Sequence, residues 1–264
     1  RGIPLVELVT VDEVRRVTDN AGRVAYFEPG HAGRTIFFHI KAQGYHVPTD
    51  GFGMSGFRFK IEPGKRAEIK LKRENLAERL YRCTGEGLYR DSVLLGHETP
   101  LENPLTGAGQ VAGQDSVLVV KYRGKLYWFW GDTMRLFYPL GLFRTAGAVS
   151  DLPDNGGLPP SAGVNYEYFT GEDGFARAMA DVADPEGVVW LDGLAVVPDE
   201  DGEERMVAHF SRRKTLADEV GQGMMLYNDR REIFEVHSTL PLSEKWRYLK
   251  GHPVRVAEGG TTYL

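Results

Sequence analysis

Cysteine is almost absent from this chain, since Cys83 is the only one among 264 residues. A single cysteine cannot form an internal disulfide, so no disulfide framework supports the fold. The sequence also lacks any run of about 18 apolar residues, and no segment is therefore predicted to cross a bilayer as a helix. Neither sign of charge dominates, because 32 basic and 37 acidic residues give a formal net charge of −5. This balance provides no electrostatic footprint for phosphate backbones, and we expect no nucleic-acid partner.

Glycine and aromatic residues, by contrast, are abundant. Glycine supplies 32 of the 264 residues, and aromatic side chains make up 11% of the chain. The average usage of glycine is about 7%, so this chain is rich in positions suited to tight turns. Many turns together with many aromatic and β-branched residues indicate short strands, and the sequence predicts an all-β protein.

The N-terminal region carries short β-branched or aromatic runs that are separated by turn signals. Two of them, residues 57–61 and 67–71, alternate strictly between apolar and polar side chains, so each should bury one face. We therefore expect a small β-sandwich over residues 1–74, followed by a charge-rich join with a helical turn or two at residues 75–80. The predicted strands lie at residues 6–10, 15–18, 24–27, 35–40, 56–61 and 67–71.

Part of this region resembles a known family of small β-modules. Residues 18–30 begin with Thr18-Asp19 and contain Gly22 and Phe27, and Gly44-Tyr45 follows. This pattern is similar to the hairpin and strand end of transthyretin-like, carboxypeptidase-regulatory-like modules. The resemblance covers about residues 1–74 and implies an accessory domain without chemistry of its own.

Residues 75–264 contain a loose repeat. In each copy, a Gly or Asp with small neighbours opens an apolar strand that is too continuous to face water on either side. Partner strands are predicted after two of the copies, at residues 125–130 and 204–210. An apolar inner strand followed by a hairpin is typical of a β-propeller blade, so we expect a propeller over residues 75–264. The copies lie at residues 85–95, 107–120, 189–197 and 221–227.

A long insertion separates the second copy from the third. Residues 151–184 hold several Pro and Gly residues, an aromatic stretch at 166–169 and a predicted short helical run at 174–183. Long irregular loops in compact domains often carry binding residues or act as lids. We expect the same of this insertion.

Three aspartates, Asp91, Asp115 and Asp192, open successive predicted inner strands. A propeller gathers its inner strands around one axis, so these carboxylates should converge on a central funnel. Carboxylates that repel one another can divide into a protonated acid and an ionised base, as hydrolysis of a glycosidic bond requires. Two alternatives remain open: each Asp caps its own turn, or together they bind Ca²⁺ or Mg²⁺ on the axis. No other cofactor is expected.

The aromatic block 128–133 provides candidate sugar contacts. Alternation along a strand places Trp128 and Trp130 on one side and Phe129 on the other. We expect Phe129 and at least one Trp to pack in the core. The functional alternative is a sugar-stacking surface, with Asp132 as a hydrogen-bonding partner for hydroxyl groups.

Other candidate residues follow the first predicted inner strand. His97 and Glu98 should lie at the rim of the funnel, where an imidazole and a carboxyl group can contact substrate. The remaining histidines show no spacing typical of zinc ligands, and we predict no metal site of that kind. No serine has the surroundings of a nucleophile elbow, and Cys83 has no activating neighbour.

These blocks resemble the strand openings of five-bladed propeller glycosidases, the arabinanase, xylosidase and levansucrase-like group. The matching stretches are Tyr-Arg-Asp-Ser at 89–92, Gly-Gln-Asp-Ser at 113–116 and Tyr-Trp-Phe-Trp-Gly-Asp-Thr at 127–133. The resemblance implies that Asp91 is the general base, that Asp115 or Asp192 tunes its pKa, and that the protein is secreted or periplasmic. The family also has a Glu general acid, which no inner strand here carries.

Glu98 and Glu167 are the loop candidates for that missing acid, and Arg90 and Gln114, which precede two of the aspartates, are expected to contact the sugar. The sequence thus predicts an inverting-type glycoside hydrolase that acts on a polysaccharide or oligosaccharide. The alternative is a non-catalytic glycan-binding or surface-interaction protein. Both interpretations make carbohydrate the partner.

The C-terminal residues 258–264 have the glycine-rich entry and β-favouring residues of another inner strand. Residues 75–264 provide about three or four blades, whereas a closed propeller typically has four to eight. We therefore expect that the chain is a fragment, and that a second polypeptide or a symmetry mate completes the ring.

Overall fold

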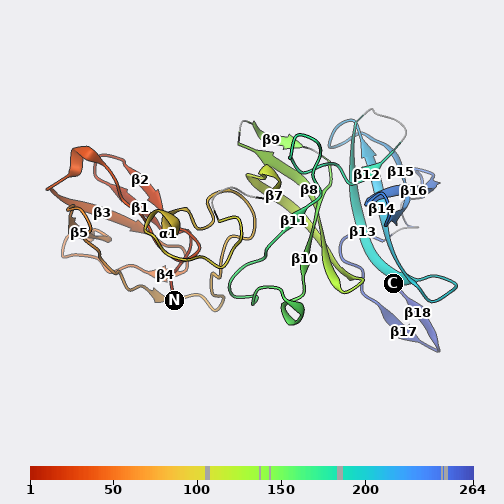
Figure 1. The fold of residues 1–264 in the computed structure, drawn as a ribbon, viewed down its shortest axis with the longest axis horizontal. Helices are drawn as coiled ribbons and strands as arrows, with labels where there is room; N and C mark the ends of the chain where they lie inside the picture. The colour runs from red at the N-terminus through yellow and green to blue at the C-terminus, as the bar shows by residue number, and fades with distance from the viewer. Residues whose placement is uncertain (105–107, 137, 143, 183–186, 245, 247–248) are drawn as a thin grey trace. The chain divides into compact units, whose positions relative to one another are not determined.

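The computed structural model describes residues 1–104, 108–136, 138–142, 144–182, 187–244, 246 and 249–264 (Figure 1). Within these residues the regular structure is almost entirely β, and the single α-helix spans five residues. The prediction of an all-β protein is confirmed. The chain forms two compact units: unit 1 comprises Arg1–Cys83, Gly87–Leu105 and Pro160–Gly163, and unit 2 comprises Thr84–Glu86, Thr106–Pro159 and Val164–Leu264.

Unit 1 contains a four-stranded antiparallel sheet in the order β2-β1-β3-β5 and a two-stranded ladder, β4-β6. A core cluster of Val6, Ile40 and Ala42 joins them, with Tyr45 of the ladder packed against it. The sheet and the ladder share this core. The elements are β1 (Glu7–Thr10), β2 (Arg15–Val17), η1 (Pro29–His31), β3 (Thr35–Lys41), β4 (Tyr45–His46), β5 (Gly56–Lys60), β6 (Lys72–Arg73) and α1 (Arg90–Leu94).

The helix α1 is fastened to unit 1 by a buried carboxylate. Asp19 is 6% exposed, and its Oδ2 accepts hydrogen bonds from the backbone N and the Oγ of Ser92, both at 2.7 Å. Its Oδ1 accepts hydrogen bonds from the backbone N of Ala21 at 2.9 Å and of Arg23 at 3.1 Å. These hydrogen bonds join residues before and after the predicted domain boundary near residue 74, and that position lies inside unit 1.

Two predicted strands of this region are not formed. Residues 24–27 and 67–71 have no regular structure. The backbone N of Ala25 donates to Asp91 Oδ1 at 2.7 Å instead of to a neighbouring strand. Ile69 is 38% exposed, and only Leu71 at the end of this run packs against the core of unit 1. Residues 75–80 likewise contain bends in place of the predicted helical turns.

Unit 2 is built from two antiparallel sheets that largely follow the order of the chain. The first has the order β11-β10-β8-β7, with β9 also paired to β8, and the second has the order β12-β16-β15-β14-β13. Only the short β12-β16 pairing is parallel among the described strands. The first sheet comprises β7 (Gly113–Tyr122), β8 (Lys125–Arg135), β9 (Tyr138–Leu142), β10 (Ala146–Asp151) and β11 (Glu167–Tyr168). The second comprises β12 (Ala180–Asp181), β13 (Val188–Pro198), β14 (Glu204–Arg213), β15 (Glu219–Asn228) and β16 (Ile233–Leu240).

The remaining elements of unit 2 are η2 (Ala108–Gln110), η3 (Pro153–Asn155) and the hairpin of β17 (Val256–Glu258) and β18 (Thr261–Tyr263). The predicted helical run near residue 174 is absent from the described residues, which contain bridges and β12. The predicted strands at 125–130, 189–197, 204–210 and 221–227 fall within β8, β13, β14 and β15, and these predictions are confirmed.

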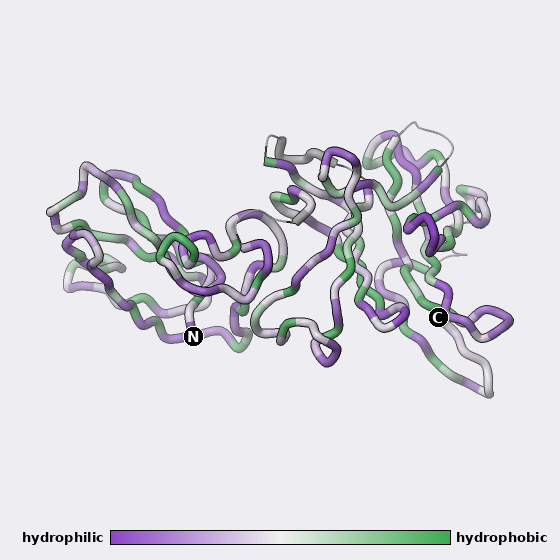
Figure 2. Tube along the Cα trace, viewed as in Figure 1, coloured by the Kyte–Doolittle hydropathy of each residue, from purple (hydrophilic) through white to green (hydrophobic). Residues whose placement is uncertain are grey.

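One core cluster holds the two sheets of unit 2 together. Phe129 of β8 and Phe234 of β16 are both 0% exposed, and their rings meet edge to face with centroids 5.2 Å apart. Figure 2 shows that hydrophobic residues run along the strands of this unit, whereas hydrophilic residues gather in the hairpin turns. The sheets are also tied by Thr145, whose Oγ1 accepts a hydrogen bond from the backbone N of Leu191 at 3.0 Å. In addition, β7 and β13 lie next to each other.

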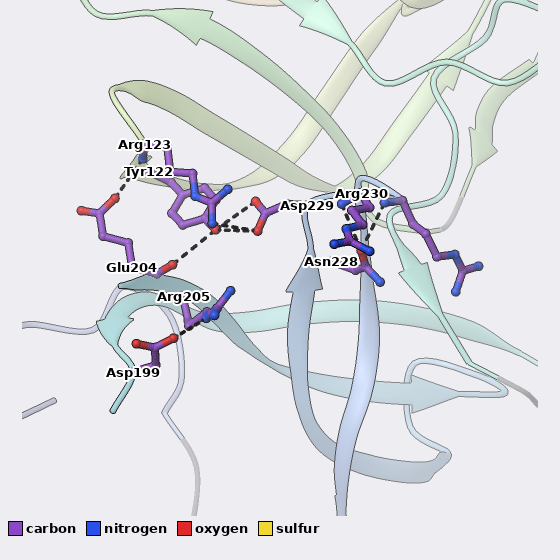
Figure 3. A network of polar contacts seen from close by, with 9 residues as sticks. Tyr122, Arg123, Asp199, Glu204, Arg205, Asn228, Asp229 and Arg230 are labelled. Carbon is purple, nitrogen blue, oxygen red and sulfur yellow. Dashed lines mark hydrogen bonds and ion pairs between the residues drawn. The ribbon is translucent and has the colours of Figure 1, made fainter. Parts of the chain in front are cut away.

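A polar network joins three hairpin turns of unit 2 (Figure 3). The Tyr122 hydroxyl, at the end of β7, lies 2.9 Å and 3.1 Å from the two carboxylate oxygens of Asp229. Arg123 pairs with Asp229 at 3.1 Å, and its backbone N donates to Glu204 Oε2 at 3.0 Å. Burial, and then the hydrogen bond with Asp229, raise the pKa of Tyr122 to about 12. The phenol therefore remains a protonated donor to the carboxylate at neutral pH.

Replacing Tyr122 with phenylalanine should lower the free energy of unfolding by about 1.5–3 kcal/mol, because a hydrogen bond to a charged group is lost. Chemical denaturation followed by tryptophan fluorescence measures the change. Tyr263→Phe provides the matched control, since Tyr263 is 55% exposed. Equal stability of Tyr122→Phe and Tyr263→Phe would show that the network does not stabilise the unit.

Candidate active site

Two aspartates face each other at one end of the β7-β8 pair. Asp115 of β7 is the register partner of Asp132 of β8. Directly opposed residues of an antiparallel pair have Cβ atoms only about 4.5–5.5 Å apart. The strand pairing therefore brings two carboxyl groups into one place.

The two carboxyl groups differ in their surroundings. Burial, and then the charge of Asp115, raise the pKa of Asp132. Asp132 Oδ1 is buried and has no hydrogen-bond partner among the described residues. Asp115, by contrast, has a polar partner, since its Oδ1 accepts a hydrogen bond from the backbone N of Ser116 at 2.6 Å. The raised pKa of Asp132 thus biases it toward the protonated form, and its neighbour Asp115 accepts a hydrogen bond from the backbone.

The backbone at this site is strained. Ser116 has a φ of 60°, a left-handed conformation that is uncommon for a residue with a side chain. Gly131 lies nearby, and a Cβ added to it would be 3.4 Å from Ser116 Cβ and 3.9 Å from Trp190 Cδ1. Strain of this kind persists only where the surrounding structure enforces it, and it is concentrated at functional sites.

Gln114 is fixed beside Asp115 from both ends of its amide. Its Nε2 donates to Thr133 Oγ1 at 3.1 Å, and its Oε1 accepts a hydrogen bond from the hydroxyl of Tyr168 at 2.6 Å. Thr133 is 0% exposed, and Tyr168 belongs to β11 within the long insertion. The insertion therefore reaches the strand that carries Asp115.

An aromatic cluster adjoins the acid pair along β8. The rings of Trp128 and Trp130 lie nearly parallel with centroids 6.3 Å apart, and Tyr166 contacts both edge to face. Trp130 is 4% exposed and acts as core, whereas Trp128 is half-buried and donates from Nε1 to Ser150 Oγ at 2.9 Å. Phe129 points to the opposite face, as predicted, and packs in the main core.

Asp192 lies on the strand next to β7, since it belongs to β13. Its Oδ1 accepts hydrogen bonds from the backbone N of Gly193 at 2.9 Å and of Gly251 at 2.5 Å. His209 is its register partner on β14. Asp115, Asp132 and Asp192 therefore all belong to unit 2.

The prediction that Asp91 opens an inner strand is wrong. Residues Arg90–Leu94 form α1, with Asp91 in its first turn, where a carboxylate is favoured by the helix dipole. Burial raises the pKa of Asp91, whereas the hydrogen bond from Ala25 opposes this shift. Asp91 belongs to unit 1, so the described structure does not unite it with the other two aspartates.

The remaining predicted residues are spread over the two units. Arg90, His97 and Glu98 belong to unit 1 with Asp91, and the backbone N of His97 donates to Ser92 O at 2.9 Å. Glu167 is exposed on β11 of unit 2, opposite Val149. Neither Glu98 nor Glu167 is buried, so neither has surroundings typical of a general acid.

Sequence reasoning did not assign roles to Tyr168 or Thr133, which hold Gln114 in place. The aromatic stretch at 166–169 was the available signal for Tyr168. Thr133 gave no signal, because only the strand register places it opposite Gln114.

The described residues contain no group of three or more His, Cys, Asp or Glu side chains arranged to hold a metal ion. The alternative of Ca²⁺ on an axis stays a prediction. No helix in the described part of the chain has the length and apolar character needed to span a bilayer.

Comparison with known proteins gives no relative. No protein-family model, curated protein or solved structure matches this chain. The function must therefore rest on the chemistry of the residues themselves.

Asp132→Asn should stabilise the protein at pH 7 and lose this advantage as the pH falls. Because the pKa of Asp132 is raised in the folded state, its ionisation above that pKa destabilises the fold. The destabilisation disappears below the pKa of the unfolded state, near 3.8, where the carboxyl group is protonated in both states. Urea unfolding of variant and wild type at about pH 7 and pH 3.5 measures the difference. Asp154→Asn, at an exposed position, should show no such trend. A constant difference for Asp132→Asn would contradict the raised pKa.

Proposed function

We propose that this chain is a glycoside hydrolase-like protein that acts on a polysaccharide or oligosaccharide through the carboxyl groups of Asp115 and Asp132. The observation that carries the proposal is the register pairing of these two aspartates together with the raised pKa of one of them. Glycosidic hydrolysis needs one carboxylate that is ionised and one carboxyl group that can donate a proton.

The pair supplies candidates for both roles. Asp115 serves as the general base, because its side chain is exposed to water and its Oδ1 already acts as a hydrogen-bond acceptor for Ser116 N. Asp132 serves as the general acid, because burial and its neighbour favour the protonated form. In this assignment, Asp132 takes the place of the Glu general acid found in the propeller glycosidases that the sequence resembles. Asp192, on the neighbouring strand β13, remains a candidate for the carboxylate that tunes the pKa of the base.

The aromatic side chains support a sugar as the substrate. Indole and phenol rings present flat apolar faces and polar edges, which suits the mixed surface of a pyranose or furanose. Trp128 lies on β8, the strand that carries Asp132, and Tyr166 of the insertion packs against its ring; both side chains are partly exposed. Gln114, held between Thr133 and Tyr168, provides an amide for a hydroxyl group.

The arrangement of strands is compatible with the proposed kinship to propeller glycosidases. Each sheet of unit 2 contains four antiparallel strands in chain order, namely β7-β8-β10-β11 and β13-β14-β15-β16. The first strands of the two sets, β7 and β13, lie next to each other. Successive blades of a propeller begin in the same way.

A combined screen tests the proposal. The full chain is incubated with neutral and acidic polysaccharides and oligosaccharides, and both release of reducing sugar and retention on each glycan are measured. Turnover of at least one glycan is expected, with a bell-shaped pH profile that reflects the acid and the base. Binding without turnover would favour the non-catalytic glycan-binding alternative. Neither binding nor turnover on any glycan would reject both.

A further inference from the structure

Residues 249–255, here called the cover segment, lie along one edge of β13. Gly251 donates its backbone N–H to Asp192 Oδ1 at 2.5 Å, and Arg255 Nη2 donates to Val196 O at 2.5 Å. Leu249 approaches so closely that a Cβ added to Gly193 would lie 2.3 Å from the Leu249 carbonyl oxygen. Gly193 also has a φ of 55°, so glycine is required there for two independent reasons.

A buried histidine is the register partner of Asp192. His209 of β14 is 2% exposed, and Gln222 of β15 is 1% exposed. The polar and charged groups that face the imidazole are Asp192 from β13, Gln222 and Glu219 from β15, and Lys250 from the cover segment. Gln222 Nε2 donates to Pro241 O at 2.5 Å.

We infer that the cover segment is an acid-sensitive closure, held on β13 while His209 is neutral and released when His209 takes up a proton. The inference rests on the geometry of Asp192, His209 and Gly251 and does not depend on the proposed hydrolase activity. Asp192 connects the two, because it accepts a hydrogen bond from the cover segment and is the register partner of His209.

The direction of the effect follows from burial. Burial lowers the pKa of His209, while Asp192, the Gln222 hydrogen bond and Glu219 raise it and Lys250 lowers it again. A histidine whose folded-state pKa is lowered keeps its stabilising contribution at neutral pH and loses it as the pH falls below about 6.5. Protonation attracts the Asp192 carboxylate to the imidazolium of His209 and places a second positive charge near Lys250. Opening the cover segment therefore exposes the buried imidazolium to water and reduces its repulsion with Lys250.

Hydrogen exchange of the Gly251 amide tests the inference on the full chain. The protection factor of this amide, corrected for intrinsic exchange, should fall at least tenfold between pH 7.5 and pH 5, whereas the amides of β14 keep their protection. His209→Gln cannot be protonated in this range, and its Gly251 amide should stay protected at both pH values. His237→Gln, at an exposed position on β16, should behave as the wild type does.

Two further measurements keep the test decisive if His209→Gln fails to fold. In the wild type, the imidazole resonances of His209 should titrate at a lower pH than those of an exposed histidine, and Gly251 protection should fall as that titration is approached. Gly193→Ala should expose the Gly251 amide at every pH, since its Cβ collides with Leu249. Protection of Gly251 that is independent of pH in the wild type, or an unchanged fall in His209→Gln, would overturn the inference.

Discussion

Asp115→Asn is expected to reduce hydrolysis by about 10²–10⁴-fold on any glycan that the wild type cleaves, which is the usual contribution of a general base. The asparagine side chain keeps an oxygen that can accept the hydrogen bond from Ser116 N, so the strand ends should keep their geometry. The loss should appear in kcat with little change in KM, because only proton abstraction is removed. Initial rates of reducing-sugar release measure it.

Asp154→Asn is the matched control for this variant, since Asp154 is an exposed aspartate in η3 of the same unit. Its rate should equal that of the wild type. Thermal midpoints of all three proteins should agree closely. If Asp115→Asn retains more than a tenth of the wild-type kcat, Asp115 is not the general base.

Asp19→Ala is expected to destabilise unit 1 by about 3–5 kcal/mol. The substitution leaves four donors without their acceptor, and the two on Ser92, which is 0% exposed, cannot turn to water. Each buried donor without a partner costs about 1–3 kcal/mol. The contact of α1 with residues 19–23 should loosen, because the two hydrogen bonds from Ser92 to Asp19 are lost, whereas the hydrogen bond from Ala25 N to Asp91 is left unaffected by the substitution.

Exchange of the Ile40 amide reports this change, since Ile40 is 6% exposed in the core of unit 1. The free energy of exchange should fall by the same 3–5 kcal/mol. Glu68→Ala, at an exposed position in unit 1, should change it by less than about 0.5 kcal/mol. An Ile40 amide that stays fully protected in Asp19→Ala would refute the structural role of Asp19.

The long strands of unit 2 could be predicted from the sequence because their apolar runs must be buried. Val189, Leu191 and Leu194 all enter the main core from β13, as a continuous apolar run predicts. The same reasoning correctly placed Phe129 in the core and Trp128 on the other face.

The first repeat was misinterpreted because an apolar stretch of a few residues does not distinguish a helix from a strand. Residues 90–94 match the other copies in composition. However, the backbone N of Ser92 donates to Asp19, and the segment forms the helix α1. The partner that decides this conformation lies 73 residues away in the sequence. Local propensity carries no information about it.

The acid pair was also hidden from sequence reasoning, although both of its members were candidates. Asp115 was assigned to the funnel and Asp132 to sugar binding, because their opposition depends on the register of β7 against β8. A one-residue change of register would place their side chains on opposite faces of the sheet. The raised pKa of Asp132 follows from that register and from burial, neither of which a motif encodes.

A crystal of the full chain soaked with an oligosaccharide selected in the glycan screen tests the central claim most directly. The account predicts a sugar ring beside Trp128 and Tyr166, with a hydroxyl or glycosidic oxygen within about 2.6–3.2 Å of the carboxyl groups of Asp115 or Asp132. An oligosaccharide bound only elsewhere on the protein, with these two aspartates uncontacted, would contradict it.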